Sequence, residues 1–268
     1  MARSTRQTVL SLMPAVLGGS VLAIGGLLVT RALVSAEALK PSNDSVGNFM
    51  QTLGGIYAVL LAFVVFVVWQ QFNETRAQIE CEANEVVDLL RTAQGLPFAA
   101  RAPIQKHLTQ YVDDVLEKEW PAMTRRDEAV FERVALRLDD VWDVLQHLEP
   151  SSACEQALHQ EALTRFNDLS DARSLRLTNS RARIPNALRL ILYIGAVILV
   201  ASTWLLGVES FSMHAFISGG LAGSVSHVIY VIEDLDNCFA GDWQVSRASF
   251  ERVRSYLRDH TAASIESA

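Results

Sequence analysis

The sequence predicts an all-α integral membrane protein, with four transmembrane helices in two hairpins and a helical, water-soluble domain between them. Half of the 268 residues are hydrophobic, and the mean hydropathy is positive. Soluble domains seldom carry so much apolar content. The excess is concentrated in four blocks without charges at their centres, each near the ~20 residues that cross a bilayer core. These blocks are Leu10–Val34, Phe49–Trp69, Leu188–Val208 and Phe211–Ile232.

The four blocks divide the chain into four segments. We predict an N-terminal transmembrane hairpin at 1–72, with helices at about 10–34 and 49–70, and a C-terminal hairpin at 186–232, with helices at about 188–208 and 211–232. Residues 73–185 form a helical domain and 233–268 a C-terminal segment. Basic residues precede the first and third blocks, so both termini and the helical domain are predicted to be cytoplasmic. A cleavable signal peptide is the alternative for the first block, but its apolar run exceeds the roughly 7–15 residues of such signals.

The middle of the chain shows helical spacing of apolar residues throughout. The second membrane helix meets no breaker after Trp69 until Gly95 and Pro97, so we expect it to project far beyond the bilayer. Two amphipathic helices follow, the first ending near Pro121 and the second running from Asp127 to Pro150.

Helix-start signals mark the remaining elements. Ser152, with Glu155 three residues later, forms a capping box that opens a fourth soluble helix. Pro185 suits the first turn of the third membrane helix, where a missing backbone N–H costs little. Ser246 is a candidate cap for a short final helix.

Composition and motifs disfavour several function classes. A net charge of −7 without a basic cluster outside the membrane flanks argues against nucleic-acid binding. The sequence has no HExxH, GxSxG, Walker or strand-linked GxGxxG motif, and its three cysteines form no CxxC pair, so we predict no catalytic residues, cofactor or metal. The acids Glu80, Glu82 and Glu85 are typical of a solvated helix face.

The second membrane helix has two distinct faces at helical spacing. One is narrow and built of small residues, and the other is bulky and includes Ile56, Leu60, Phe63 and Val67. If several copies surround an axis, such bulky side chains form an apolar constriction that gates ions by dewetting. Contact with lipid is the equal alternative for this face.

The fourth membrane helix and the turn after it carry small and acidic residues. Gly219 and Gly223 are four apart, a spacing that lets membrane helices approach closely. Asp234, Asp236 and Asp242 could bind a cation, but the EF-hand spacing is absent, which favours a structural turn.

Two segments resemble the bacterial bestrophin-like domain family. The run Leu53–Phe63, followed by an acid-rich helix with Glu82 and Ala83, is similar to the opening of that family, and Asp234–Gly241 with Val245 and Ser246 is similar to its closing signature. The sequence departs at Cys238, where the family pattern has proline. The resemblance covers about Phe49 to Leu257 and implies distant similarity to bestrophins, which are pentameric ion channels lined by their second membrane helix.

The resemblance implies a homo-oligomeric, pentameric ion channel in a bacterial inner membrane, whose partners are other copies of itself, lipid and inorganic ions. A membrane-anchored scaffold or sensor that binds a partner protein is the alternative. Carboxylate rings near the cytoplasmic exit would favour cations. The implied neck residues are Ile56, Leu60, Phe63 and Val67; the next choice of face is Tyr57, Leu61, Val64 and Val68; the vestibule acids are Glu74, Glu80, Glu82 and Glu85.

Overall fold

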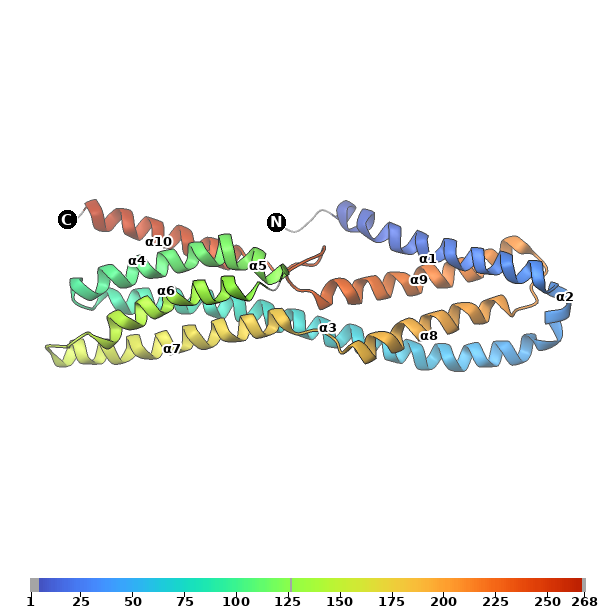
Figure 1. The fold of residues 1–268 in the computed structure, drawn as a ribbon, viewed down its shortest axis with the longest axis horizontal. Helices are drawn as coiled ribbons and strands as arrows, with labels where there is room; N and C mark the ends of the chain where they lie inside the picture. The colour runs from blue at the N-terminus through green and yellow to red at the C-terminus, as the bar shows by residue number, and fades with distance from the viewer. Residues whose placement is uncertain (1–4, 126, 267–268) are drawn as a thin grey trace. The chain divides into compact units, whose positions relative to one another are not determined.

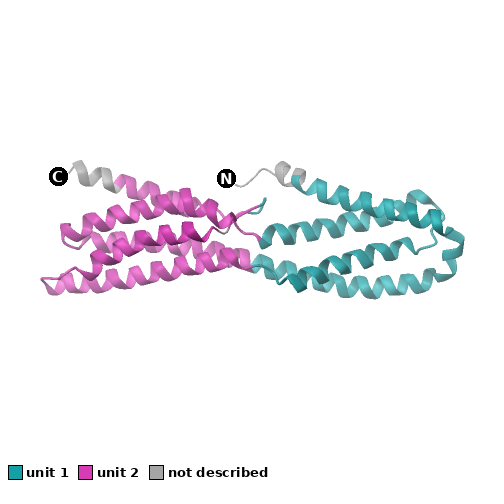
Figure 2. Ribbon diagram, in the orientation of Figure 1, with its two compact units in different colours: residues 1–70, 183–236, 241–243 teal, residues 71–182, 237–240, 244–268 magenta. Residues whose placement is uncertain are grey.

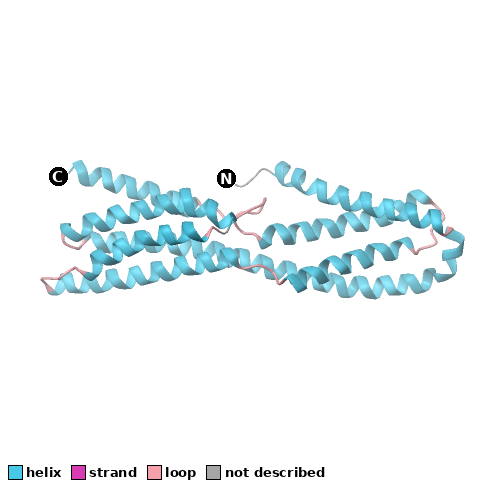
Figure 3. Cartoon of the chain, in the orientation of Figure 1, coloured by secondary structure: helices cyan, strands magenta, loops and turns pink. Residues whose placement is uncertain are grey.

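The computed structural model describes residues 5–125 and 127–266, which are helical apart from short connections (Figure 3). The elements, labelled in Figure 1, are Thr5–Leu33 (α1), Ala36–Leu39 (α2), the 3-10 turn Lys40–Ser42 (η1), Asn43–Gln94 (α3), Phe98–Asp114 (α4), the π-helical turn Val115–Glu119 (η2), Trp120–Arg125 (α5), Glu128–Gln146 (α6), Ala153–Arg181 (α7), Asn186–Trp204 (α8), Phe211–Asp236 (α9) and Ala248–Glu266 (α10). The described residues contain no strand, so the predicted all-α class is confirmed.

The chain forms two compact units (Figure 2). Unit 1 takes in the chain up to Gln70 together with Arg183–Asp236 and Gly241–Trp243. Unit 2 comprises Gln71–Ala182, Asn237–Ala240 and the chain from Gln244 onward. The long helix α3 contributes residues to both units.

Unit 1 contains the membrane-crossing helices. Over the described residues, four helices are long and apolar enough to span a bilayer, and they include α1, α3, α8 and α9. Helices α1 and α9 lie side by side (Figure 1). Many large apolar side chains of this unit point outward, Leu22 and Phe216 among them at 77% and 76% exposed. Such a surface is stable against hydrocarbon rather than water, so the predicted membrane protein is confirmed.

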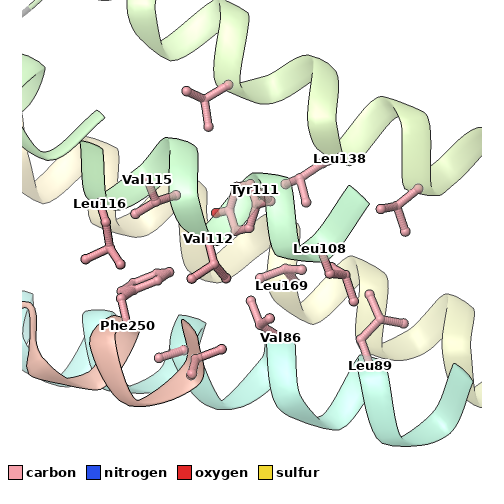
Figure 4. Close-up of a cluster of buried hydrophobic side chains, with 14 of the residues drawn as sticks. Val86, Leu89, Leu108, Tyr111, Val112, Val115, Leu116, Leu138, Leu169 and Phe250 are labelled. Atoms are coloured by element: carbon pink, nitrogen blue, oxygen red, sulfur yellow. The ribbon is translucent and has the colours of Figure 1, made fainter. Parts of the chain in front are cut away.

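Unit 2 is a helical bundle around one apolar core. Side chains of α3, α4, α6, α7 and α10 converge there, and Figure 4 shows Leu89, Leu108, Leu138, Leu169 and Phe250 among them. Along each helix, the core residues recur every three or four positions, which places them on the buried face of that helix. Burial of that apolar stripe supplies the main stabilisation of the bundle.

Two of the predicted helix boundaries have clear chemical causes. Helix α3 ends at Gln94, directly before Gly95, as the sequence predicts. The Ser152 hydroxyl accepts the N–H of Glu155 at 3.1 Å and so caps α7. The Glu155 carboxylate returns one residue further than in a standard capping box, to the N–H of Ser151 at 2.7 Å.

The prediction that a helix ends near Pro121 is wrong. The chain continues through η2 into α5, and Pro121 lies inside α5. The turn Val115–Glu119 is π-helical, and the N–H of Trp120 bonds to the carbonyl of Val115 five residues back. Widening the helix by one residue relieves the clash between a proline ring and the preceding turn, so the helix tolerates Pro121.

Candidate functional site

Helix α3 exposes a stripe of large apolar side chains in unit 1. Ile56, Val59, Phe63 and Phe66 follow one another at intervals of three and four residues and are 59–72% exposed. This spacing places them on one side of the helix. The sequence between Phe49 and Trp69 contains no charged residue. The stripe contains two of the four predicted neck residues, Ile56 and Phe63.

The opposite side of α3 is buried inside unit 1. Tyr57 is 4% exposed, and Val64 and Val68 are fully buried. The Tyr57 hydroxyl donates to the carbonyl of Leu192 in α8 at 2.8 Å. Its ring lies against Gly195, where an added Cβ would come within 2.6 Å of the ring. Tyr57 therefore packs α3 against α8, and Tyr57, Val64 and Val68 of the next-choice pore face lie buried inside the protomer.

The other predicted α3 residues are intermediate in exposure. Leu60, Leu61 and Val67 are partly buried. Leu60 and Leu61 pack against the cluster of Tyr57, Leu199 and Val225. They therefore contribute to the helix packing of unit 1.

The expectation that Glu82 faces water is wrong. Its side chain is fully buried in unit 2, where the Arg176 guanidinium binds both of its oxygens, at 2.5 and 3.0 Å. The hydroxyl of Tyr111, also fully buried, donates to the same carboxylate. Burial raises the pKa of Tyr111 well above its usual value, and the nearby Glu82 charge adds to the rise.

A second carboxylate completes this buried charge network. Glu119, in the π-helical turn, accepts from Arg176 at 2.5 Å and from Arg173 at 2.6 Å. Arg173 also donates to the carbonyl of Phe131 at 2.7 Å. Two cations thus face two anions inside the bundle, which is how a protein tolerates buried charge.

The sequence contained a signal for the buried position of Glu82 that the charge pattern concealed. Ile79, Glu82, Val86 and Leu89 are spaced by three and four residues, and the three apolar members are buried in the core. Glu82 therefore occupies a core position of the amphipathic helix. Its partner Arg176 is 94 residues away, so no local pattern in the sequence could identify the cation that binds Glu82.

The remaining predicted vestibule acids differ among themselves. Glu74 and Glu80 are exposed on α3, and Glu80 pairs with Arg76 at 3.2 Å. Glu85 is mostly buried and lies 3.6 Å from Arg165 of α7. The four predicted vestibule acids of α3 therefore do not all face water.

The two glycines of α9 lie where that helix meets α1. An added Cβ on Gly223 would come within 2.8 Å of the Ser20 hydroxyl and 3.2 Å of Val16, and one on Gly219 within 3.2 Å of Ile24. The Ser20 hydroxyl also donates to the carbonyl of Gly219 at 2.8 Å. Close approach of the backbones thus lets one helix hydrogen-bond directly to the other.

The three aspartates lie at the C-terminal end of α9 and in the turn after it, and the Asp242 carboxylate accepts from the Tyr230 hydroxyl at 3.0 Å. Asp234 accepts the backbone N–H groups of Asp242 and Trp243, at 2.9 and 2.7 Å. Asp236 accepts from the N–H of Ile184 at 2.7 Å and pairs with Arg189 at 2.8 Å. Gly241, directly before Asp242, has a positive φ of 83°, which suits a tight turn. The geometry therefore supports the structural turn over the ion-binding one.

Sequence reasoning also missed a buried ionisable group in unit 1, His214. It lies in the first turn of α9 and is 1% exposed. One ring nitrogen is 2.7 Å from the carbonyl of Thr203, and the other is 3.3 Å from Arg31. Arg31 also donates to the carbonyl of Val208. These contacts tie α1, α8 and α9 together at the end of unit 1 where the α8–α9 connection lies.

Comparison with known proteins agrees with this architecture. A family model described as the bestrophin-like domain matches residues 18–250. No curated protein sequence matches the chain. Among solved structures, a bacterial bestrophin homologue from Klebsiella pneumoniae is similar at a TM-score of 0.69 and 16% identity in one single-substitution variant, covering 96% of this chain and 99% of that one.

Two further structures of the same homologue give a consistent result. Another variant has a TM-score of 0.69 at 14% identity, over 92% of this chain and 98% of that one. A structure phased with zinc has a TM-score of 0.64 at 16% identity, over 95% and 98%. Identities this low show a shared fold and do not by themselves transfer a function. The family model spans most of the chain, and this protein therefore belongs to the bestrophin-like domain family.

Proposed function

We propose that the protein is a homo-oligomeric ion channel, with α3 of each protomer lining a shared pore. The observation that carries the proposal is the exposed apolar stripe of α3, opposite a face that is anchored inside its own unit. Ile56 and Phe63 are the central neck residues, with Val59 and Phe66 beside them. The family resemblance supports this arrangement because bestrophins are channels that conduct along their second membrane helix. It likewise supports a pentamer.

Two phenylalanines provide a matched test of this proposal. Phe63 of α3 is 59% exposed and Phe216 of α9 is 76% exposed, so truncating either removes an exposed ring. In planar bilayers, Phe63→Ala should change the unitary current or the open probability, because a narrow apolar neck controls conduction by dewetting. Phe216→Ala should leave both unchanged. Bilayers that stay silent with a well-folded oligomer would contradict the channel.

A second phenylalanine of the stripe tests the rotation of α3. Phe66 lies three residues from Phe63 and is 61% exposed. If the pore axis faces Phe63, then Phe66→Ala should have the smaller effect on current, because a step of three residues turns a helix away from the axis. The reverse order would place Phe66 at the constriction.

We propose a preference for cations on the basis of Glu74 and Glu80, the two predicted acids that the structure leaves exposed. Carboxylates near a pore exit raise the local concentration of cations. The double variant Glu74→Gln with Glu80→Gln should move the reversal potential, measured in a salt gradient, toward 0 mV. That is the value for a channel that does not distinguish cations from anions. An unchanged reversal potential would remove these acids from the proposal.

A further inference from the structure

Unit 1 contains an apolar groove lined by α1, α8 and α9. The groove has a volume of about 540 Å³. Small side chains leave this space open, since Gly19 and Ala23 of α1 and Ala222 of α9 line it together with Ala196 of α8. All of its lining residues belong to helices that cross the membrane, so its surroundings are hydrocarbon.

The two ends of the groove differ in chemistry. At one end lies Trp204, whose indole N–H donates to the carbonyl of Ala23 at 3.0 Å. At the other end the lining contains Tyr193, Tyr230 and Glu233. The eleven helical steps from Tyr193 to Trp204 rise by ~16 Å along α8. Half of a bilayer's hydrocarbon core is ~15 Å deep, so the groove matches the depth of one leaflet.

The polar end of the groove presents a carboxylate, that of Glu233. Glu233 pairs with Arg189 at 2.8 Å and accepts from the Tyr193 hydroxyl at 3.1 Å. Arg189 also pairs with Asp236 at 2.8 Å, and the positive charge of Arg183 acts on the same carboxylate. Among the described residues that line the groove, Glu233 is the only charged one, and its side chain is 33% exposed. An ammonium group with N–H donors complements this carboxylate.

We propose that the groove binds one acyl chain of a phospholipid whose headgroup carries a primary ammonium, such as phosphatidylethanolamine. The chain lies along α8 with its end toward Trp204. The ammonium meets Glu233, and Arg189, which is 29% exposed, lies within reach of the lipid phosphate. This binding site requires only unit 1, so it is independent of the proposed pore.

Native mass spectrometry of the purified, delipidated protein tests this site with phosphatidylethanolamine, phosphatidylcholine and phosphatidylglycerol added separately. Ala196→Leu fills part of the groove, while Ala201→Leu adds the same side chain to α8 outside the lining. We expect Ala196→Leu to weaken phosphatidylethanolamine binding by at least about tenfold, because the added side chain occupies the space of the acyl chain. Ala201→Leu should bind as the unmodified protein does.

A second variant keeps the test decisive if Ala196→Leu fails to fold. Glu233→Gln retains the size of the side chain and removes its charge. It should abolish the preference for phosphatidylethanolamine over the other two lipids. Equal binding of all three lipids by the unmodified protein would overturn the proposal. The proposal would also be overturned if the Ala196→Leu protein lost its oligomeric state but still bound lipid. That result would mean that a second copy of the chain occupies the groove.

Discussion

Units 1 and 2 place charge and apolar surface in opposite ways. In unit 1, large side chains such as Val59 and Phe216 point outward at 72% and 76% exposed. In unit 2, the ion-paired side chains of Arg176 and Glu82 are buried completely, close to the apolar core. The same chain thus builds one unit for a hydrocarbon solvent and the other for water. Exposed apolar area identifies the first, and a satisfied buried network identifies the second.

The largest test of this comparison is the removal of Arg176. Arg176→Met leaves the buried carboxylates of Glu82 and Glu119 short of a partner, which should destabilise unit 2 by about 3–5 kcal/mol. Arg165→Met, also on α7, removes a side chain that is 34% exposed and should cost about 0.5 kcal/mol. Denaturant unfolding followed by tryptophan fluorescence measures both.

The double variant Arg176→Met with Glu82→Gln separates charge from packing. If the cost of Arg176→Met comes from an unpaired buried charge, neutralising Glu82 should recover part of it. Equal losses for Arg176→Met and Arg165→Met would show that unit 2 does not depend on its buried network.

A smaller effect is expected where unit 1 packs through glycine. Gly223→Leu places a side chain against Val16 and Ser20 of α1 and should cost about 1–3 kcal/mol through overpacking. Gly220→Leu is the matched control, because nothing lies within 4 Å of a Cβ added there. Thermal unfolding in detergent should show a lower midpoint for Gly223→Leu alone. Equal unfolding midpoints for Gly223→Leu and Gly220→Leu would contradict close packing of Gly223 against α1.

The difference between the units also explains what the sequence could predict. Four apolar blocks and the absence of a breaker between Trp69 and Gly95 were enough to predict the membrane helices and the long projection of α3. Those features depend on local properties, namely hydropathy and backbone preference. The α1–α9 contact had a local signal too, the four-residue spacing of Gly219 and Gly223.

Features that depend on distant residues were not predictable in the same way. The environment of Glu82 is set by Arg176 and Tyr111, which lie 94 and 29 residues away. The face of α3 that packs inside unit 1 is set by Leu192 and Gly195 of α8. Both faces of that helix are apolar, so hydropathy could not rank them, and only the tertiary contacts separate Tyr57 from Ile56.

The smallest expected effect concerns an ion pair at the surface of unit 2. The Asp114 carboxylate accepts a hydrogen bond from Arg137 at 3.1 Å and pairs with Lys118 at 2.5 Å. Although burial alone would raise the pKa of Asp114, the bonds from Lys118 and Arg137 outweigh it and hold the pKa below its ordinary value. The carboxylate therefore stabilises the fold above its unfolded pKa of about 3.9, and this contribution is lost as the pH falls through the lower, folded pKa.

Asp114→Asn should accordingly cost about 1 kcal/mol at pH 7, and the difference from the unmodified protein should shrink below about pH 4. Asp139→Asn, at an exposed position of α6, should change stability by less than about 0.5 kcal/mol at either pH. Thermal unfolding at a series of pH values measures both variants. A cost for Asp114→Asn that stays constant down to pH 3 would mean that the side chain acts through its shape, and that the surface of unit 2 gains nothing from this charge.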